Sequence, residues 1–355
     1  MPDWTKSMQQ TYEFYEVDTK TWSNKRPLDF IKSADIVKDS SNDTLEYATI
    51  ETTEEFDECY VRIYLVTIQN EIEDKIPLGT YLCQAPGFNY DGKTSNITVD
   101  AYSSISELKD GMPNVGYYIA KTRNIAEISA MLTEDNVRAP VVAANSSSTL
   151  KTNFVANPDD TWFSFLKDLL AQGDLSFELD AMGNVLFSSP ANMNTMRPIW
   201  TYTDGNSSIL YPDIDLERDL YGIPNVVQVV YSDDNGTVSG QAVNNDADSP
   251  TSTKSRGRKI IYREVNPDSA PANVSSAWLN EYAELKLKEL STLEYKVTYT
   301  HGYCPVRVGD CVSLDYSRAG IKIDRALVTR QHIKCIPGCP VEETAIYTIN
   351  LWGDN

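Results

Sequence analysis

Short runs of alternating apolar and polar residues, separated by turn-forming residues, most constrain how this chain can fold. In the first hundred residues such runs cover 45–50, 60–66, 79–82 and 96–101. A period of two places successive side chains on opposite faces of a strand. The 21 tyrosines agree with this pattern, because tyrosine favours strands and half-buried interfaces. The sequence therefore predicts a mainly β protein built from sandwiches or small barrels.

Similar runs return in the last part of the chain. They cover 225–232, 294–300, 311–316, 325–333 and 345–352. Asp91-Gly92 and Asn235-Gly236 predict tight hairpins, because an Asp-Gly or Asn-Gly pair accepts the positive φ of such turns. Two further segments interrupt the strands. Residues 243–258 lack apolar side chains and predict an exposed loop, and residues 276–290 predict a long helix with a broad apolar surface.

The middle of the chain has a mixed pattern. Helical spacing of apolar residues covers 124–133 and 159–172, with Asp159 or Asp160 as the expected cap of the second helix. A hairpin of 175–179 with 185–187 follows. The predicted organisation is an N-terminal β-barrel over 1–113, an inserted α+β domain over 114–197 and a second β-barrel over 198–355.

The charge balance limits the partners of the chain. With 51 acidic and 31 basic residues its formal charge is −20, which disfavours binding of nucleic acid through phosphate contacts. The acidity fits either a solubility charge or the wall of a channel along which DNA slides without binding. No apolar run is long enough to span a bilayer and no signal peptide is recognisable, so folding in the cytoplasm is expected.

Six cysteines in 355 residues are too few for a disulfide-built scaffold. Four of them could form a zinc or disulfide cluster with the histidines nearby: Cys304, Cys311, Cys335 and Cys339. Their spacing fits thiols that simply pack in a core better than it fits a metal site. Cys59 and Cys83 lie on strands that could be neighbours, where a disulfide would require oxidation after release from the cell.

Catalysis has little support in the sequence. The only histidines are His301 and His332, and neither lies in a recognisable nucleophile context. The motifs of hydrolases, zinc proteases, phosphate loops and dinucleotide sites are missing from the sequence. Scattered carboxylate pairs are expected by chance in so acidic a chain. The sequence therefore predicts a protein without enzymatic activity and without a cofactor.

Several short motifs, in a fixed order, resemble those of a known family. They are LGTYL at 78–82, ITVDAYSSISEL at 97–108, TW at 161–162, DAMGNV at 180–185, IPNVV at 223–227, DSP at 248–250, GR at 257–258 and VGDCV at 308–312. Through them the chain resembles the hub proteins of phage tails. That family is related to baseplate hubs, to type VI secretion spike bases and to the N-terminal part of siphophage tail-associated proteins.

The resemblance implies a fold and a role. It implies two tube-like β-barrel domains with a mixed domain between them, assembled as a homotrimeric ring at the tail tip of the virion. Such a ring would join the tail tube or distal tail protein to tip, spike or receptor-binding proteins and line the channel for DNA or the tape-measure protein. The enzymatic or receptor-binding extensions that siphophage relatives often carry are not expected here.

Two other functions remain open at this point. A host-surface carbohydrate-binding module is the main alternative, suggested by the aromatic residues Trp200, Tyr202 and Tyr211 if they are exposed. Packing in a core or an interface is the commoner fate of such residues. A cell-wall hydrolase has only the scattered carboxylates in its favour. Neither alternative has a motif of its own.

Overall fold

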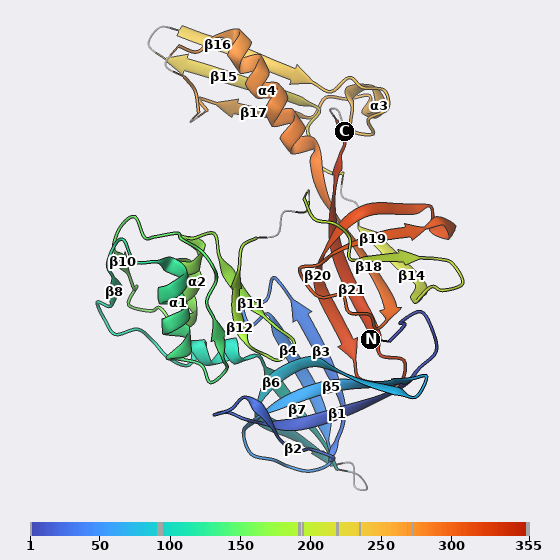
Figure 1. The fold of residues 1–355 in the computed structure, drawn as a ribbon. Helices are drawn as coiled ribbons and strands as arrows, with labels where there is room; N and C mark the ends of the chain where they lie inside the picture. The colour runs from blue at the N-terminus through green and yellow to red at the C-terminus, as the bar shows by residue number, and fades with distance from the viewer. Residues whose placement is uncertain are drawn as a thin grey trace. The chain divides into compact units, whose positions relative to one another are not determined.

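The computed structural model describes residues 2–90, 95–190, 193, 195–217, 220–233, 236–267, 269–271 and 273–352 (Figure 1). The chain forms two compact units. The first comprises Met1–Ile214 and Thr298–Ala345, and the second comprises Asp215–Val297 and Ile346–Asn355. Within the described ranges, none of the helices has the length and hydrophobicity needed to span a lipid bilayer.

A 13-stranded sheet dominates the structure. Its strands are β1 (Gln9–Asp18), β2 (Ser23–Pro27), β3 (Ile31–Asp39), β4 (Glu46–Thr52), β5 (Cys59–Gln69), β6 (Ile72–Tyr90), β7 (Ser95–Tyr102), β13 (Trp200–Thr203), β14 (Leu210–Glu217), β18 (Thr292–Gly302), β19 (Cys311–Tyr316), β20 (Ile321–Lys334) and β21 (Pro340–Asn350). The order is β14-β18-β21-β20-β3-β4-β7-β6-β5-β1-β2, with β19 beside β20 and β13 beside β19.

The prediction of a mainly β chain is confirmed, but the two predicted barrels do not appear as closed, separate sheets. Strand β20 connects the early and late strands, because its first half pairs with β19 and its residues 330–334 pair with β3. In the described part of the chain, β2, β13 and β14 each have a single partner in this sheet, and none of the three pairs with another of them. The sheet is therefore open.

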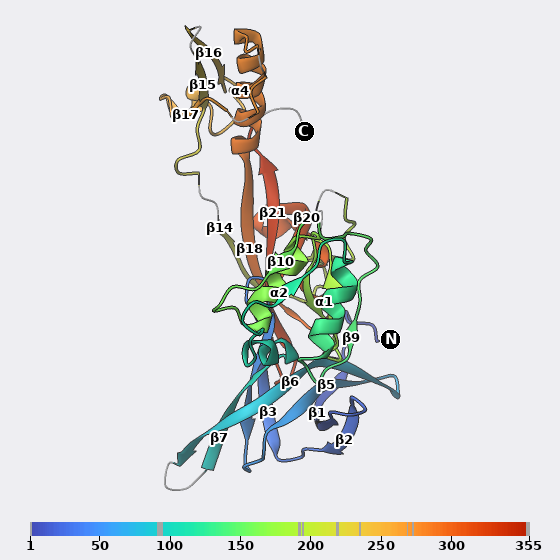
Figure 2. The ribbon, with the colours of Figure 1, turned by 90° about the vertical axis from the view of Figure 1, so that its left-hand side faces the viewer.

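The mixed region lies between β7 and β13. Its elements are the 3₁₀ helix η1 (Ser104–Lys109), β8 (Tyr118–Ile119), α1 (Ile125–Glu134), β9 (Val141–Val142), β10 (Phe154–Val155), α2 (Trp162–Ala171), β11 (Ser176–Leu179) and β12 (Val185–Ser188). Figure 2 shows α1 and α2 from the side. The apolar faces of both helices form one core with the hairpin β11–β12, with Trp22 of the β1–β2 turn and with Tyr60 of β5.

Helix α2 begins later than predicted. Its N-cap is Thr161, whose hydroxyl accepts a hydrogen bond from the Ser164 N–H at 3.2 Å, so the expected caps Asp159 and Asp160 were wrong. The Ser164 hydroxyl in turn accepts from the Thr161 N–H at 3.0 Å. This reciprocal pair is a capping box, which satisfies two backbone donors that the first helical turn leaves free.

One carbonyl anchors the hairpin β11–β12 to the main sheet. The Met182 carbonyl oxygen, in the hairpin turn, accepts hydrogen bonds from Trp22 Nε1 at 2.9 Å, Arg62 Nη2 at 3.1 Å and Thr80 Oγ1 at 2.9 Å. Arg62 is 1% exposed, and its Nε also donates to Thr80 Oγ1. Gly183 follows with φ of 77°, where a Cβ would lie 2.7 Å from the Thr80 Cβ. The turn therefore requires glycine both for its backbone angle and for space.

The second unit contains a three-stranded sheet of β16 (Gly236–Val243), β15 (Val226–Asp233) and β17 (Ile261–Val265), with the short helix α3 (Thr253–Arg256). Helix α4 (Ser276–Ser291) packs on it through Leu279, Ala283 and Leu287. The approach is close, because a Cβ on Gly240 of β16 would lie 2.5 Å from the Leu279 carbonyl carbon. The outer residue Leu285 of α4 is 67% exposed.

In the polar segment 243–258, where an exposed loop was predicted, most side chains are exposed, and buried polar side chains order the backbone. Asn225 is fully buried; its amide donates to the carbonyls of Thr251 and Arg258 and accepts from the Ile260 N–H at 2.8 Å. Asn244, also fully buried, donates to Ser249 Oγ at 2.8 Å. Buried amides that are fully hydrogen-bonded can fix a backbone without apolar residues.

Of the predicted turn residues, Asp91, Gly92 and Asn235 lie outside the described residues.

Candidate functional site

Three features could carry function: the open ends of the main sheet, a buried polar cluster and a large cavity. At one end of the sheet, all five residues of β2 are exposed. At the other end, β14 carries the exposed carboxylates Asp213, Asp215 and Glu217. Both strands contain a proline, and charged residues and proline limit unspecific pairing of sheet edges.

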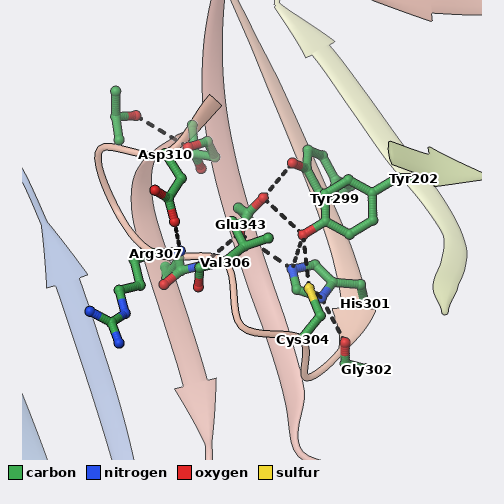
Figure 3. Close-up of polar contacts among 12 residues, drawn as sticks. Tyr202, Tyr299, His301, Gly302, Cys304, Val306, Arg307, Asp310 and Glu343 are labelled. Carbon is green, nitrogen blue, oxygen red and sulfur yellow. Dashed lines mark hydrogen bonds and ion pairs between the residues drawn. The ribbon is translucent and has the colours of Figure 1, made fainter. Parts of the chain in front are cut away.

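The polar cluster lies among β13, β18, β20 and β21 and centres on Glu343 (Figure 3). One carboxylate oxygen of Glu343 accepts from Tyr299 Oη at 2.5 Å and Tyr202 Oη at 3.2 Å. The other oxygen accepts from Gln331 Nε2 at 2.6 Å and lies 3.4 Å from His301 Nε2. Glu343 and His301 are both fully buried.

The surroundings of His301 favour its protonated form. Its Nδ1 lies 2.7 Å from the Gly302 carbonyl oxygen, which can only accept, so Nδ1 carries a proton. Its Nε2 faces the Glu343 carboxylate and the Tyr202 hydroxyl. Burial by itself lowers the pKa of His301, but hydrogen bonds to Cys304 and Glu343 and the charge of Glu343 raise it to about 10.

This arrangement is an ion pair enclosed in the β-sheet core. Every polar atom of the pair has a partner inside the protein, which is what keeps a buried charge pair stable. The sequence suggested neither partner, because Glu343 and His301 are 42 residues apart and belong to no local motif. Tyr202, one of the aromatic residues behind the carbohydrate-binding alternative, is 1% exposed and packs in this cluster, which is the commoner fate expected for such residues.

The other histidine and the remaining expected aromatic residues lie elsewhere. His332 is on β20 opposite Val37, and its Nε2 lies 3.7 Å from Asp35 Oδ1. Trp200 on β13 is half-buried, and Tyr211 on β14 is 42% exposed. The structure therefore does not bring Tyr202 and Tyr211 together on one exposed aromatic surface.

The structure brings only some of the cysteines together. Cys335 and Cys339 flank the turn from β20 to β21. Burial raises the pKa of the Cys335 thiol well above its usual value, and the nearby Cys339 acts in the same direction. Cys304 contacts Tyr202 and His301, and Cys311 lies on β19. In the ranges that the structure describes, no three Cys, His, Asp or Glu side chains are grouped to hold a metal. The zinc or disulfide cluster stays a prediction.

Cys59 and Cys83 lie directly opposite each other on β5 and β6. Both are free thiols. Burial, together with the nearby Glu16 carboxylate, raises the pKa of Cys59 to about 11. A thiol with so high a pKa forms little thiolate at neutral pH and reacts slowly.

A cavity of about 690 Å³ lies in the first unit, between the mixed region and the main sheet. Its walls are the β3–β4 turn, helix α2, strand β11 and the residues just before β19 and within β20. Asp310 lies in its wall. Burial raises the pKa of Asp310, and the nearby charges of Glu343 and Glu178 act in the same direction.

The fold as a whole is similar to solved phage tail proteins. The tail protein from Neisseria meningitidis MC58 matches over 95% of this chain and 96% of its own, with 12% identity and a TM-score of 0.61. The 43 kDa tail protein of prophage MuSo2 from Shewanella oneidensis matches over 95% and 98%, with 10% identity and a TM-score of 0.61. A chain of the Francisella PdpA-VgrG complex matches over 96% and 58%, with 8% identity and a TM-score of 0.54.

Comparison at the level of sequence finds less. No family model matches the chain, and no curated protein matches it. At these identities the structural similarity concerns the fold. The resemblance to phage tail hub proteins, predicted from short motifs, is confirmed in the fold of the whole chain.

Proposed function

We propose that this chain is a structural subunit of a phage tail, a hub protein at the distal end of the tail. The observation that carries the proposal is the similarity of fold to two phage tail proteins over nearly the full length of all three chains. A fold alone does not define a function. Here the fold, the motif order and the lack of a recognisable catalytic motif point to the same role.

The open sheet supports a role in assembly. A sheet that does not close leaves unpaired backbone groups at its end strands, and in the described part of this chain these are β2, β13 and β14. Repeated contacts between identical chains close most readily into symmetric rings. We therefore assign the chain to a homotrimeric ring. In it, residues 1–113 and 198–355 would act as two tube-like β domains, with residues 114–197 inserted between them.

The acidic surface supports a role beside a channel. A net charge of −20 repels DNA and would let it pass without binding. The partners of such a ring would be the tail tube or distal tail protein on one side and tip, spike or receptor-binding proteins on the other. The tape-measure protein and DNA would pass through in transit.

The core cluster supports a structural rather than an enzymatic role. Glu343, His301 and Cys304 are the groups in this chain that most resemble catalytic residues, and all three are fully or almost fully buried. Their hydrogen-bonding capacity is used within the protein, which stabilises a sheet core instead of presenting reactive groups to a substrate.

Two measurements test the proposal. Light scattering of the purified chain should give three times the mass of the monomer or, if the ring forms only with its tail neighbours, three copies of the chain in the complex. Electron microscopy of virions labelled with an antibody against this chain should show the label at the distal end of the tail. Virions without label at the tail end, or a monomer that binds host glycans in isolation, would contradict the proposed role.

A further inference from the structure

Strand β11 has an unpaired edge that faces a cavity. In its three-stranded sheet the order is β11-β12-β9, so β11 has a partner on one side only. Its register with β12 pairs Glu178 with Leu186 and Leu179 with Val185. The turn after β11 is held by the three hydrogen bonds to the Met182 carbonyl, so this edge is fixed in place.

The hydrogen bonds of β12 identify which backbone groups of β11 lie on its unpaired edge. The Val185 N–H donates to the Pro140 carbonyl beside β9, so the backbone of Val185 faces β9. Its neighbour Leu186 therefore faces β11 and pairs with Glu178, because backbone groups alternate in direction along a strand. The N–H and C=O groups of Phe177 and Leu179 then face away from β12. Within the described ranges, neither residue's backbone forms a hydrogen bond on that side.

The cavity runs along this edge. All four residues of β11 line it, as do Val308, Gly309 and Asp310 on the opposite wall. Successive side chains of a strand point to opposite faces, so a cavity that contacts four successive residues follows the strand's edge rather than one face. Its volume of about 690 Å³ lies within the range of roughly 300–1,000 Å³ that is usual for ligand sites.

The charges in the cavity wall do not balance. Three ion pairs neutralise most of them: Lys38 with Glu46 at 3.0 Å, Lys167 with Asp43 at 3.0 Å, and Asp39 with Arg330, which lies outside the wall, at 3.8 Å. Glu178 and Asp310 remain, with Arg307 as the one cation in the described wall that forms no ion pair. The site is therefore acidic beside a row of free backbone groups.

We propose that this cavity binds an extended segment of a partner polypeptide, which adds a fourth strand to the sheet along β11. The free N–H and C=O groups of Phe177 and Leu179 would pair with the backbone of the segment. A lysine or arginine of the segment would lie beside Glu178 and Asp310, and its small apolar residues would pack on Leu170, Leu175 and Val328. This inference does not depend on the proposed ring.

Peptide binding to the full-length chain tests the proposal. The probe is a fluorescein-labelled hexapeptide of alternating valine and lysine, blocked at both ends, and binding is followed by fluorescence anisotropy. A second peptide carries glutamate in place of lysine. A third keeps the lysines but has its alternate backbone amides methylated, which removes strand hydrogen bonds at constant charge. We expect the first peptide to bind at least tenfold more tightly than either of the others.

The methylated peptide is the essential control. A chain with a charge of −20 attracts any cationic peptide, and this attraction is the same for both lysine peptides. A difference between them therefore reports pairing of backbones. Equal affinity of the two lysine peptides, or no binding of the first at millimolar concentration, would refute strand addition.

Variants locate the binding site. Glu178→Lys should weaken binding of the lysine peptide at least tenfold and strengthen binding of the glutamate peptide. The matched control is Glu134→Lys, an exposed change of the same charge at the end of α1, outside the cavity. Leu179→Pro removes an outward N–H while leaving the bonds between β11 and β12, and should also abolish binding; its melting temperature shows whether the fold is kept. Equal effects of the substitutions at 178 and 134 would place the peptide elsewhere.

Discussion

At the scale of single residues, Glu343 and His301 form a charge pair in which both side chains are fully buried. A buried charge is stable only while its partner and its hydrogen bonds remain. Four side chains other than Glu343 supply them here, from three different strands. The pair therefore links strands that are far apart in sequence.

Removing the charge of Glu343 should therefore destabilise the protein. Glu343→Ala leaves the His301 imidazolium buried without a partner and should lower the free energy of unfolding by roughly 3–5 kcal/mol, measured by urea denaturation. The matched control is Glu342→Ala on the same strand, whose side chain is 44% exposed and bonds to Arg330. An exposed pair of this kind contributes about 1 kcal/mol or less. Similar losses in the two variants would contradict the assigned role of the cluster.

The same pair predicts how stability depends on pH. The pKa of His301 is raised to about 10 in the folded state, compared with about 6.5 when unfolded. The contribution of His301 to the free energy of unfolding is therefore fully present below pH 6.5 and is lost as the pH rises toward 10. Between pH 7 and 8.5 the free energy of unfolding should fall by about 1.4 kcal/mol per pH unit because of this group.

Replacing His301 with glutamine should remove this dependence of the free energy of unfolding on pH. The difference in unfolding free energy between the wild type and His301→Gln, measured by urea denaturation at several pH values, should shrink as the pH rises from 7 to 8.5. His332→Gln is the control, because it leaves the buried pair intact. A difference that is independent of pH would show that His301 is neutral in the folded protein.

At the scale of elements, one turn decides where the hairpin β11–β12 lies. Gly183→Ala would combine a strained φ of 77° with a contact of 2.7 Å to Thr80 and should destabilise the protein by roughly 2–4 kcal/mol. Gly116→Ala has a similar φ of 79° but nothing within 4 Å, and should cost about 1 kcal/mol. Thermal unfolding monitored by circular dichroism compares them. Equal losses would show that the contact with Thr80 is unimportant.

Local periodicity predicted the helices well and the strands only in part. The expected helices at 124–133 and 276–290 correspond to α1 and α4 within one residue. Strand β6 extends over Ile72–Tyr90, although only 79–82 were expected, because Pro77 breaks the alternation and register shifts bend the strand. Strand β1 has many polar residues and was not predicted. A polar strand is recognisable only once its neighbours are known.

The candidate sites could not be predicted from local sequence. The partners of Glu343 come from residues 202, 299, 301 and 331, and no spacing rule connects them. The free edge of β11 depends on the sheet order β11-β12-β9, in which β9 and β12 pair in parallel. In the segment 243–258, the low hydrophobicity predicted exposure. Composition alone does not reveal that the Asn244 side chain is fully buried and hydrogen-bonded.

At the scale of the whole molecule, the two units have separate cores, so unfolding should proceed in two steps. Gly240→Ala would push against the backbone of α4 and should lower the melting temperature of the second unit alone. Glu343→Ala should lower that of the first unit alone. Differential scanning calorimetry distinguishes the two. A single transition that moves equally in both variants would show that the units unfold together.

The pairing of β3 with β20 has a consequence for synthesis in the cell. About 290 residues separate the two strands, and a ribosome that adds roughly 5–20 residues per second needs about 15–60 seconds to make them. Throughout that time the nascent chain holds an edge of β3, with Ile36 and Val37, that has not yet met its partner. Chaperones that bind emerging hydrophobic segments should therefore raise the yield of soluble protein, and slow codons between the two strands should reduce it.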